Sequence, residues 1–181
     1  QLIRPRFCSN NNSWISRDSR MNGTDSNTTE DVTFGRSGCR SPMKTFSISK
    51  QLPVDPARVW AVLTNASKLA SGPIGITKLE GTVALGQSIT LWTEATGDRP
   101  FKLTVTSLEA GKSMVWEGGM PLGLFRGVRR FTLTPKDGGV QFDMSETFSG
   151  LMSGLIVKSI PDLTPSFEKF ATGLLALAQK E

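Results

Sequence analysis

The chain of 181 residues carries 21 Lys and Arg against 16 Asp and Glu, a formal net charge of +5. It contains no His and no Tyr, and its two cysteines, Cys8 and Cys39, both precede residue 43. These absences exclude a nucleophile activated by His, a His-ligated zinc site and a disulfide framework after residue 43. No apolar run approaches the roughly 18 residues of a membrane-spanning helix. We therefore expect no membrane span, and we also expect neither a bound metal nor a cofactor.

The composition changes at Met43, and the two sides are interpreted separately. Residues 1–42 are rich in Ser, Asn, Thr and Arg and show neither helical nor strand periodicity. Such a segment buries too little apolar surface to offset the entropy lost on ordering, so we expect a disordered or non-native leader. A targeting peptide is the alternative, although acidic residues are unusual in a transit peptide. Residues 43–181 have the length of one domain.

The charge of this predicted domain is mild and spread along the sequence. From Met43 onward there are 15 Lys and Arg against 12 Asp and Glu, a net charge of +3. The segment "FRGVRRF" lacks the second small residue and the stacking aromatic residues of an RNA-binding motif. We therefore expect no nucleic-acid partner. Because no secretion signal is recognisable, we expect a cytoplasmic location.

The first elements of the domain are a strand and two short helices. Residues 43–52, "MKTFSISKQL", alternate between apolar and polar side chains, which predicts a half-buried strand. Asp55 is a good N-cap with Pro56 in the first helical position, so a helix is predicted over 55–64. Trp60 lies at the edge of its apolar stripe as a packing anchor, with lining of an interior cavity as the alternative. A second helical turn then ends near Gly72 and Pro73.

In the next part of the sequence, apolar side chains recur at every second position, which predicts six more strands. Turn residues separate the segments, and Pro135 to Gly138 form a hairpin signal between the last two. The predicted strands cover residues 76–81, 87–95, 101–108, 113–118, 123–134 and 139–148. Mostly antiparallel pairing is expected because the connections are short.

The C-terminal part returns to helical spacing. Apolar residues recur at three- and four-residue steps, and Thr164 can cap the helix with Pro165 in its first position. The stripe consists of Leu163, Phe167, Phe170, Leu174, Leu177 and Ala178. The preceding apolar segment, residues 150–161, is interrupted by Gly and Pro, so it forms either a kinked helical segment or a mobile loop.

This order of elements resembles the START-like, helix-grip superfamily, also called SRPBCC. The likeness is carried by "LPVDPARVWAVLTN" (52–65), the "EGG" turn (117–119), the hairpin of 124–148 and "PSFEKFATGLLALAQK" (165–180), and it covers 43–181. The resemblance implies an α+β fold in which a curved antiparallel sheet of about seven strands wraps around the C-terminal helix. Members include polyketide cyclase/dehydrase-like proteins, lipid-transfer domains and heat-shock-ATPase-activator homologues. They share a cavity rather than a catalytic motif.

The resemblance implies a ligand cavity between the sheet and the last helix. The candidate lining residues are the large apolar ones that strand alternation or the helical stripe turns inward. They are Phe101, Leu103, Val105, Phe131, Leu133, Phe142, Met144 and Phe148 from the strands, and Phe167, Phe170 and Leu174 from the helix. The alternative is that these residues form a plain hydrophobic core.

Strand parity also predicts an inward ion pair between Arg129 and Glu146. If Phe131 faces the interior on one strand and Met144 does on the next, the same parity turns both charged residues inward. Pairing Phe131 with Met144 then places Arg129 opposite Glu146. Such a pair would offer a polar contact to a bound molecule, and a salt bridge without a ligand role is the alternative. A bulge near Gly127 would shift the parity.

These observations favour a domain, monomeric or homodimeric, that binds a small, apolar or amphipathic molecule. One alternative is a cyclase- or dehydratase-like enzyme, whose proton transfer would depend on Glu146, Asp143, Arg129 or bound water. The other is a protein-binding module of the chaperone-activator type. The enzyme predicts an interior carboxylate with a raised pKa, whereas the protein-binding module predicts a contiguous exposed apolar patch.

Overall fold

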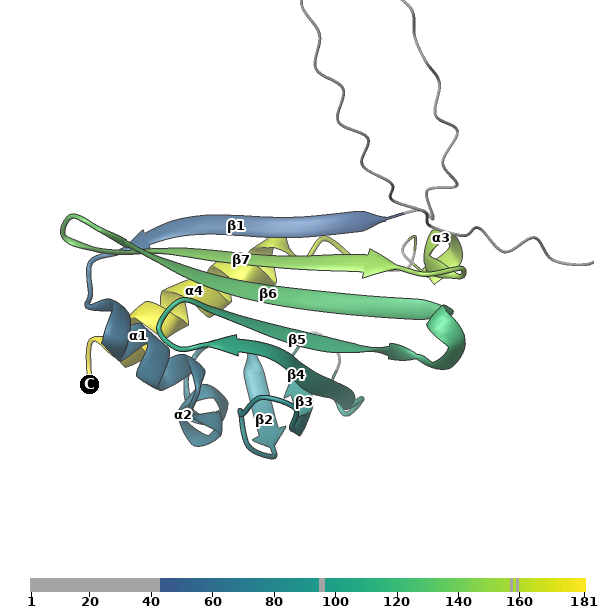
Figure 1. Ribbon diagram of the computed structural model, residues 1–181, viewed down its shortest axis with the longest axis horizontal. Helices are drawn as coiled ribbons and strands as arrows, with labels where there is room; N and C mark the ends of the chain where they lie inside the picture. The colour runs from purple at the N-terminus through teal and green to yellow at the C-terminus, as the bar shows by residue number, and fades with distance from the viewer. Residues whose placement is uncertain (1–42, 95–96, 157, 159) are drawn as a thin grey trace, which may run out of the picture. The chain divides into compact units, whose positions relative to one another are not determined.

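The computed structural model describes residues 43–94, 97–156, 158 and 160–181. The leader predicted over residues 1–42 lies outside the described residues. The described part is an α+β fold with a seven-stranded antiparallel sheet, short helices after the first strand and a longer C-terminal helix (Figure 1). The predicted fold class is confirmed.

The elements follow the predicted order. The strands are β1 (Lys44–Leu52), β2 (Ile76–Glu80), β3 (Ser88–Thr93), β4 (Phe101–Glu109), β5 (Ser113–Met120), β6 (Phe125–Lys136) and β7 (Gly139–Ser149). The helices are α1 (Pro56–Leu63), α2 (Ala66–Ser71), the 3-10 turn η1 (Pro121–Gly123), α3 (Ser153–Ile156) and α4 (Thr164–Ala178).

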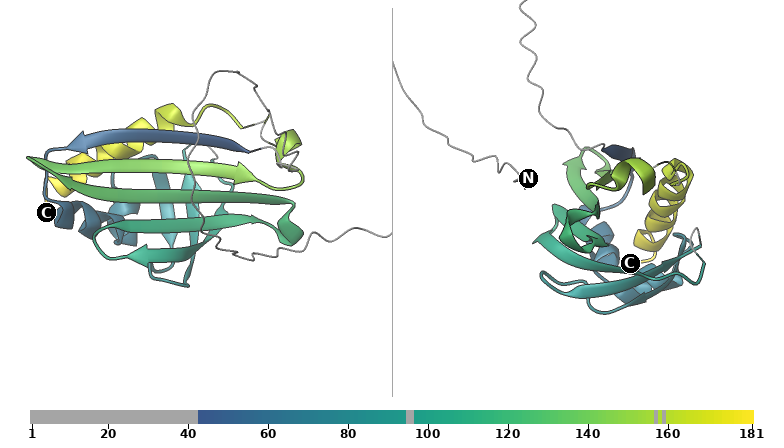
Figure 2. Two further views of the ribbon diagram at one scale, coloured as in Figure 1. Left: turned by 45° about the horizontal axis from the view of Figure 1, so that its top comes forward. Right: turned by 90° about the vertical axis from the view of Figure 1, so that its right-hand side faces the viewer.

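The strands lie in the order β1-β7-β6-β5-β4-β3-β2, and each neighbouring pair is antiparallel. Helices α1 and α2 carry the chain from β1 at one edge to β2 at the other. The sheet curls toward α4, which lies on its concave side (Figure 2). Two polar contacts tie α4 to opposite parts of the sheet: Lys50 Nζ donates to Thr172 Oγ1 at 2.8 Å, and Lys169 Nζ lies 2.5 Å from Glu94 Oε2.

Helix α1 begins where the sequence predicted. The Asp55 side chain accepts a hydrogen bond from the Ala57 N–H at 2.7 Å, which satisfies one of the donors left unpaired at a helix start. Val59, Val62 and Leu63 are fully buried, so the predicted apolar stripe packs against the core. Trp60 is half-buried and packs against the same core.

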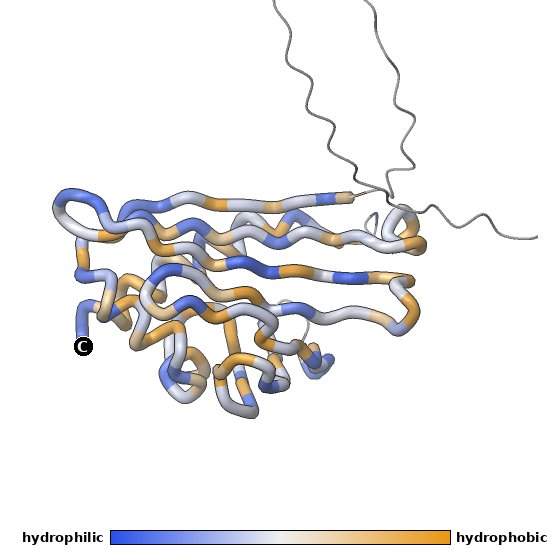
Figure 3. Tube along the Cα trace, viewed as in Figure 1, coloured by the Kyte–Doolittle hydropathy of each residue, from blue (hydrophilic) through white to orange (hydrophobic). Residues whose placement is uncertain are grey.

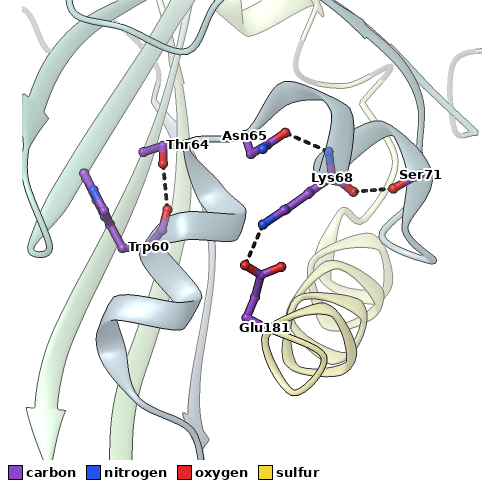
Figure 4. A network of polar contacts seen from close by, with 6 residues as sticks. All are labelled: Trp60, Thr64, Asn65, Lys68, Ser71 and Glu181. Atoms are coloured by element: carbon purple, nitrogen blue, oxygen red, sulfur yellow. Dashed lines mark hydrogen bonds and ion pairs between the residues drawn. The ribbon is translucent and has the colours of Figure 1, made fainter.

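The end of α1, helix α2 and the C-terminus are joined by a short network (Figure 4). Thr64 Oγ1 donates to the Trp60 carbonyl at 2.9 Å, and the Asn65 side chain accepts from the Lys68 N–H at 3.1 Å. Lys68 Nζ in turn lies 2.5 Å from Glu181 Oε2. The last residue of the chain is therefore held against α2.

The start of α4 differs from the prediction. Thr164 is the first helical residue rather than the cap, and Leu163 occupies the cap position without a side-chain hydrogen bond. Asp162 takes the capping role instead, because its Oδ1 accepts from the Thr164 N–H at 3.0 Å and from Thr164 Oγ1 at 2.7 Å. These hydrogen bonds hold the pKa of the Asp162 carboxyl below its usual range.

The core lies between the concave face of the sheet and α4. Apolar and polar residues follow one another along the strands, as the colours in Figure 3 show. Phe131, Phe142 and Phe170 form one aromatic group, with ring centroids 5.7 to 6.4 Å apart. Two of these rings come from the sheet and one comes from α4, so the group fixes the helix onto the sheet.

Candidate functional site

The most polar part of the concave face is the pair Arg129 and Glu146. The two residues are direct partners in the β6–β7 register. Arg129 Nη2 and Nε donate to Glu146 Oε2 at 2.6 and 3.1 Å, and the two side chains are 17% and 14% exposed. The register runs unbroken from Arg126 to Lys136, so the alternative of a bulge near Gly127 is wrong. The predicted ion pair and its register are confirmed.

The ion pair faces α4. The guanidinium carbon of Arg129 lies 5.5 Å from the centre of the Phe167 ring, a distance at which a cation is attracted to an aromatic face. Phe167 is 2% exposed and belongs to the buried stripe of α4. The charges therefore lie between sheet and helix, in a region that is otherwise apolar.

A third polar group on this face was missed by the sequence reasoning. Trp116 of β5 is the direct partner of Arg129 in the β5–β6 register, so its side chain is on the same face of the sheet. The side chain is fully buried, its ring lies 4.9 Å from that of Phe131, and its Nε1 atom has no hydrogen-bond partner among the described residues. We refer to Trp116, Arg129 and Glu146, which lie side by side on β5, β6 and β7, as the interior row.

The predicted lining residues are packed to different degrees. The strand residues Val105, Phe131, Leu133, Phe142, Met144 and Phe148 and the helix residues Phe167, Phe170 and Leu174 are all buried. Leu103 is half-buried against the same core. Phe101, at the start of β4, is 45% exposed although it is paired with the buried Leu91, because it lies at the end of the strand. A buried apolar residue can line a ligand cavity or belong to a plain hydrophobic core, and burial is the same in both cases. The ligand-binding role of these residues therefore stays a prediction.

Two open hollows are defined on the surface. One, of about 410 Å³, lies between Pro73 and the flank of α4 that carries Lys169 and Gly173. The other, of about 460 Å³, lies between the start of α1 and the β6–β7 hairpin. None of the residues that were predicted to line the cavity borders either hollow. The existence of the cavity therefore stays a prediction.

Exposed apolar side chains gather at one end of the sheet. They belong to the β5–β6 connection and the segment that follows β7, which lie at the same end of the domain (Figure 1). We call this group the apolar tip, and it consists of Met120, Leu122, Leu151, Met152 and Leu155. A contiguous exposed apolar patch is the feature that was expected of the protein-binding alternative.

On the β5–β6 strands, Glu117 and Arg126 form a bidentate ion pair, with Arg126 Nε and Nη2 at 2.5 and 2.6 Å from the two carboxylate oxygens. These hydrogen bonds from Arg126 hold the pKa of the Glu117 carboxyl below its usual range.

In the described part of the chain, no three acidic or Cys side chains gather in an arrangement that could hold a metal ion. None of the helices described there is both long and apolar enough to cross a membrane.

Solved structures with the same fold include proteins of different kinds. Protein MLL2253 from Mesorhizobium loti is 19% identical, with a TM-score of 0.58 over 76% of this chain and 98% of its own. The Zhui aromatase/cyclase from Streptomyces sp. R1128 is 11% identical, with a TM-score of 0.61 over 77% and 95%. Norcoclaurine synthase from Thalictrum flavum is 13% identical, with a TM-score of 0.58 over 80% and 99%. At these identities the likeness shows the fold alone.

Sequence comparison gives the family directly. No curated protein matches the chain. The model of the family described as polyketide cyclase / dehydrase and lipid transport matches residues 43–179, which is nearly all of the described domain. With the helix-grip arrangement of sheet and C-terminal helix also in place, the chain belongs to the polyketide cyclase / dehydrase and lipid transport family, within the SRPBCC superfamily.

Proposed function

We propose that the domain binds a small, largely apolar molecule between the concave face of the sheet and α4, and that the molecule carries an oxygen acceptor, such as a ketone or carboxylate. The observation that supports this most is the buried Trp116 Nε1, for which the described part of the chain offers no hydrogen-bond partner. An indole N–H can only donate, and leaving such a group buried and unpaired costs about 1 to 3 kcal/mol. An acceptor on a bound molecule would remove that cost.

The neighbouring residues define the character of this molecule. Most of the concave face is aromatic or aliphatic, so a ligand gains affinity mainly by burying apolar surface. Arg129 uses Nε and Nη2 to hold Glu146, and its Nη1 group can still donate to a ligand oxygen. The interior row thus supports one polar end of a molecule whose remainder is apolar.

A cyclase- or dehydratase-like reaction in the same interior is the second candidate. The observation that favours it is the interior carboxylate of Glu146 beside Arg129, because a positioned carboxylate can move a proton from a bound ketone. Family membership is compatible with this reaction and with binding alone. The two candidates therefore differ in whether a bound ketone is changed.

The binding proposal is tested with two naphthalenes of the same size. Acetylnaphthalene carries a carbonyl oxygen and ethylnaphthalene does not, and each is titrated to displace a fluorescent anilinonaphthalene probe. We expect both to displace the probe, with acetylnaphthalene about tenfold tighter because of one added hydrogen bond. Trp116→Phe should remove this preference and keep the binding of ethylnaphthalene.

Trp92→Phe is the matched control, because Trp92 on β3 is only half-buried and belongs to neither the interior row nor the buried core. It should leave the preference unchanged. If a folded wild-type protein releases no probe with either compound, the binding proposal is wrong. If both compounds bind equally well to wild type, binding stands but the role of Trp116 is wrong.

A further inference from the structure

The apolar tip is built from two segments that are bonded to each other. Leu151 N–H donates to the Gly123 carbonyl at 3.2 Å, and Met152 N–H donates to the Leu124 carbonyl at 2.8 Å. An added Cβ at Gly150 would lie 2.6 Å from the Leu124 carbonyl oxygen, so the two backbones approach closely. The tip is therefore one surface, rather than two loops that are exposed separately.

The large apolar side chains of the tip are turned into solvent. Leu122 is 91% exposed, Leu151 76% and Leu155 70%. Leu122 also has φ of 60°, and it is the one non-glycine residue with positive φ in the part of the chain that the structure describes. The left-handed backbone is unfavourable for a residue with a Cβ atom. Here it points a leucine away from the core, although asparagine or glycine would fit the turn better.

The two segments that form the tip carry no acidic side chain, although Glu117 and Asp162 lie just outside them. Residues 118–136 and 149–161, which contain both segments, include no Asp and no Glu. Lys158 is exposed two residues after α3, and Arg126 is exposed at the start of β6, where Glu117 compensates its charge. An apolar surface with an exposed lysine beside it and no acidic side chain in its own segments complements a layer that is apolar inside and negative at its surface.

We propose that the apolar tip docks on the surface of a lipid bilayer that contains anionic lipid. The projecting aliphatic side chains of Leu122, Leu151 and Leu155 enter the boundary between headgroups and acyl chains, and Lys158 lies among the headgroups. A fluid bilayer accepts projecting side chains without a shaped groove, whereas a folded protein partner needs complementary pockets. This docking goes beyond the proposed ligand binding and does not depend on it.

The test is flotation of the full-length protein with vesicles of phosphatidylcholine, with and without phosphatidylglycerol. We expect the wild-type protein to float with the vesicles that contain phosphatidylglycerol and to bind pure phosphatidylcholine vesicles less. Leu122→Asn combined with Leu155→Asn should lower the partition coefficient by about tenfold or more, because less apolar surface is buried. Asn is well tolerated at the positive φ of residue 122, so the fold should be kept.

Two single variants separate the apolar and electrostatic parts. Lys158→Gln should weaken binding to the anionic vesicles and leave binding to pure phosphatidylcholine unchanged. Leu85→Asn is the matched control, since Leu85 is 60% exposed between β2 and β3, outside the apolar tip. It should bind like wild type, and circular dichroism should show every variant folded.

Three results would overturn the proposal. One is a folded wild-type protein that stays with the aqueous fraction for both vesicle types. Another is equal loss of vesicle binding in Leu85→Asn and in the Leu122/Leu155 variant, which would mean nonspecific adsorption. The last is a wild-type dimer in size-exclusion chromatography that the Leu122/Leu155 variant dissociates without a change in vesicle binding, which would assign the tip to a second copy of the chain.

Discussion

Arg129 and Glu146 face each other across β6 and β7, and two nitrogens of the guanidinium donate to a single carboxylate oxygen, Oε2. Both side chains are more than four-fifths buried. Removal of two charges from water costs several kcal/mol for each ion, and their mutual attraction offsets this cost only while both are present. Loss of one partner is therefore more damaging than loss of both.

The first prediction concerns this imbalance. Glu146→Gln should lower the free energy of unfolding by about 2 to 4 kcal/mol, because it leaves Arg129 with an uncompensated charge. The double variant Arg129→Met/Glu146→Leu should recover part of the loss. Urea unfolding measures both effects. Glu80→Gln is the control, since Glu80 pairs with Lys78 on the surface, where both side chains are more than half exposed; it should change stability by less than about 1 kcal/mol.

The second prediction concerns pH. Hydrogen bonds from Arg126 lower the pKa of Glu117 in the folded state, so this pair stabilises the fold above the unfolded pKa of the carboxyl. That stability is lost as pH falls through the folded pKa. Arg126→Gln should therefore lower the free energy of unfolding at neutral pH. It should also reduce the loss of that free energy when the pH is lowered. The contribution should stay below about 1 kcal/mol, because the Arg126 side chain is 56% exposed.

Urea unfolding of wild type and Arg126→Gln at neutral pH and at about pH 3 measures this difference. The two stability curves should converge at acid pH. Curves that stay parallel over the whole range would show that the Glu117–Arg126 pair does not contribute to the acid dependence.

The third prediction concerns the contact between α4 and the segment before β2. A Cβ added at Gly173 would lie 2.6 Å from both the Pro73 carbonyl oxygen and Ile74 Cγ2. Since one of these atoms is backbone, either the helix or the segment must shift. Gly173→Ala should cost about 1 to 3 kcal/mol despite the better helix propensity of Ala. Ser166→Ala, at an exposed position of the same helix, should be neutral or slightly stabilising in the same thermal melt.

The fourth prediction concerns residues 1–42. Because their sequence has no burial pattern, a chain that starts at Met43 should keep the melting temperature of the full chain. Differential scanning calorimetry of both proteins at equal concentration measures this. A melting temperature several degrees lower in the shorter chain would mean that residues 1–42 stabilise the domain.

Part of the candidate site was predictable because strand geometry is strictly periodic. Side chains alternate between the two faces of a strand, so the parity of Phe131 and Met144 was enough to turn Arg129 and Glu146 inward and to pair them. The short Pro135 to Gly138 connection restricted the register of that hairpin. No comparable turn signal indicated which residue of β5 would lie opposite Arg129, and Trp116 was missed.

The sequence by itself determined the order of strands and helices, the buried faces of β1, β6 and β7, and the start of α1 at Asp55, because these depend on local periodicity and capping. Only the tertiary structure decided three other features. Trp116 became a buried donor because β4 and β6 flank its strand, and Phe101 stayed exposed because β4 begins at the rim of the sheet. The apolar tip formed because residues 28 positions apart are bonded to each other, Leu151 to Gly123 and Met152 to Leu124. Burial and patches depend on neighbours that are distant in the sequence, and periodicity carries no information about them.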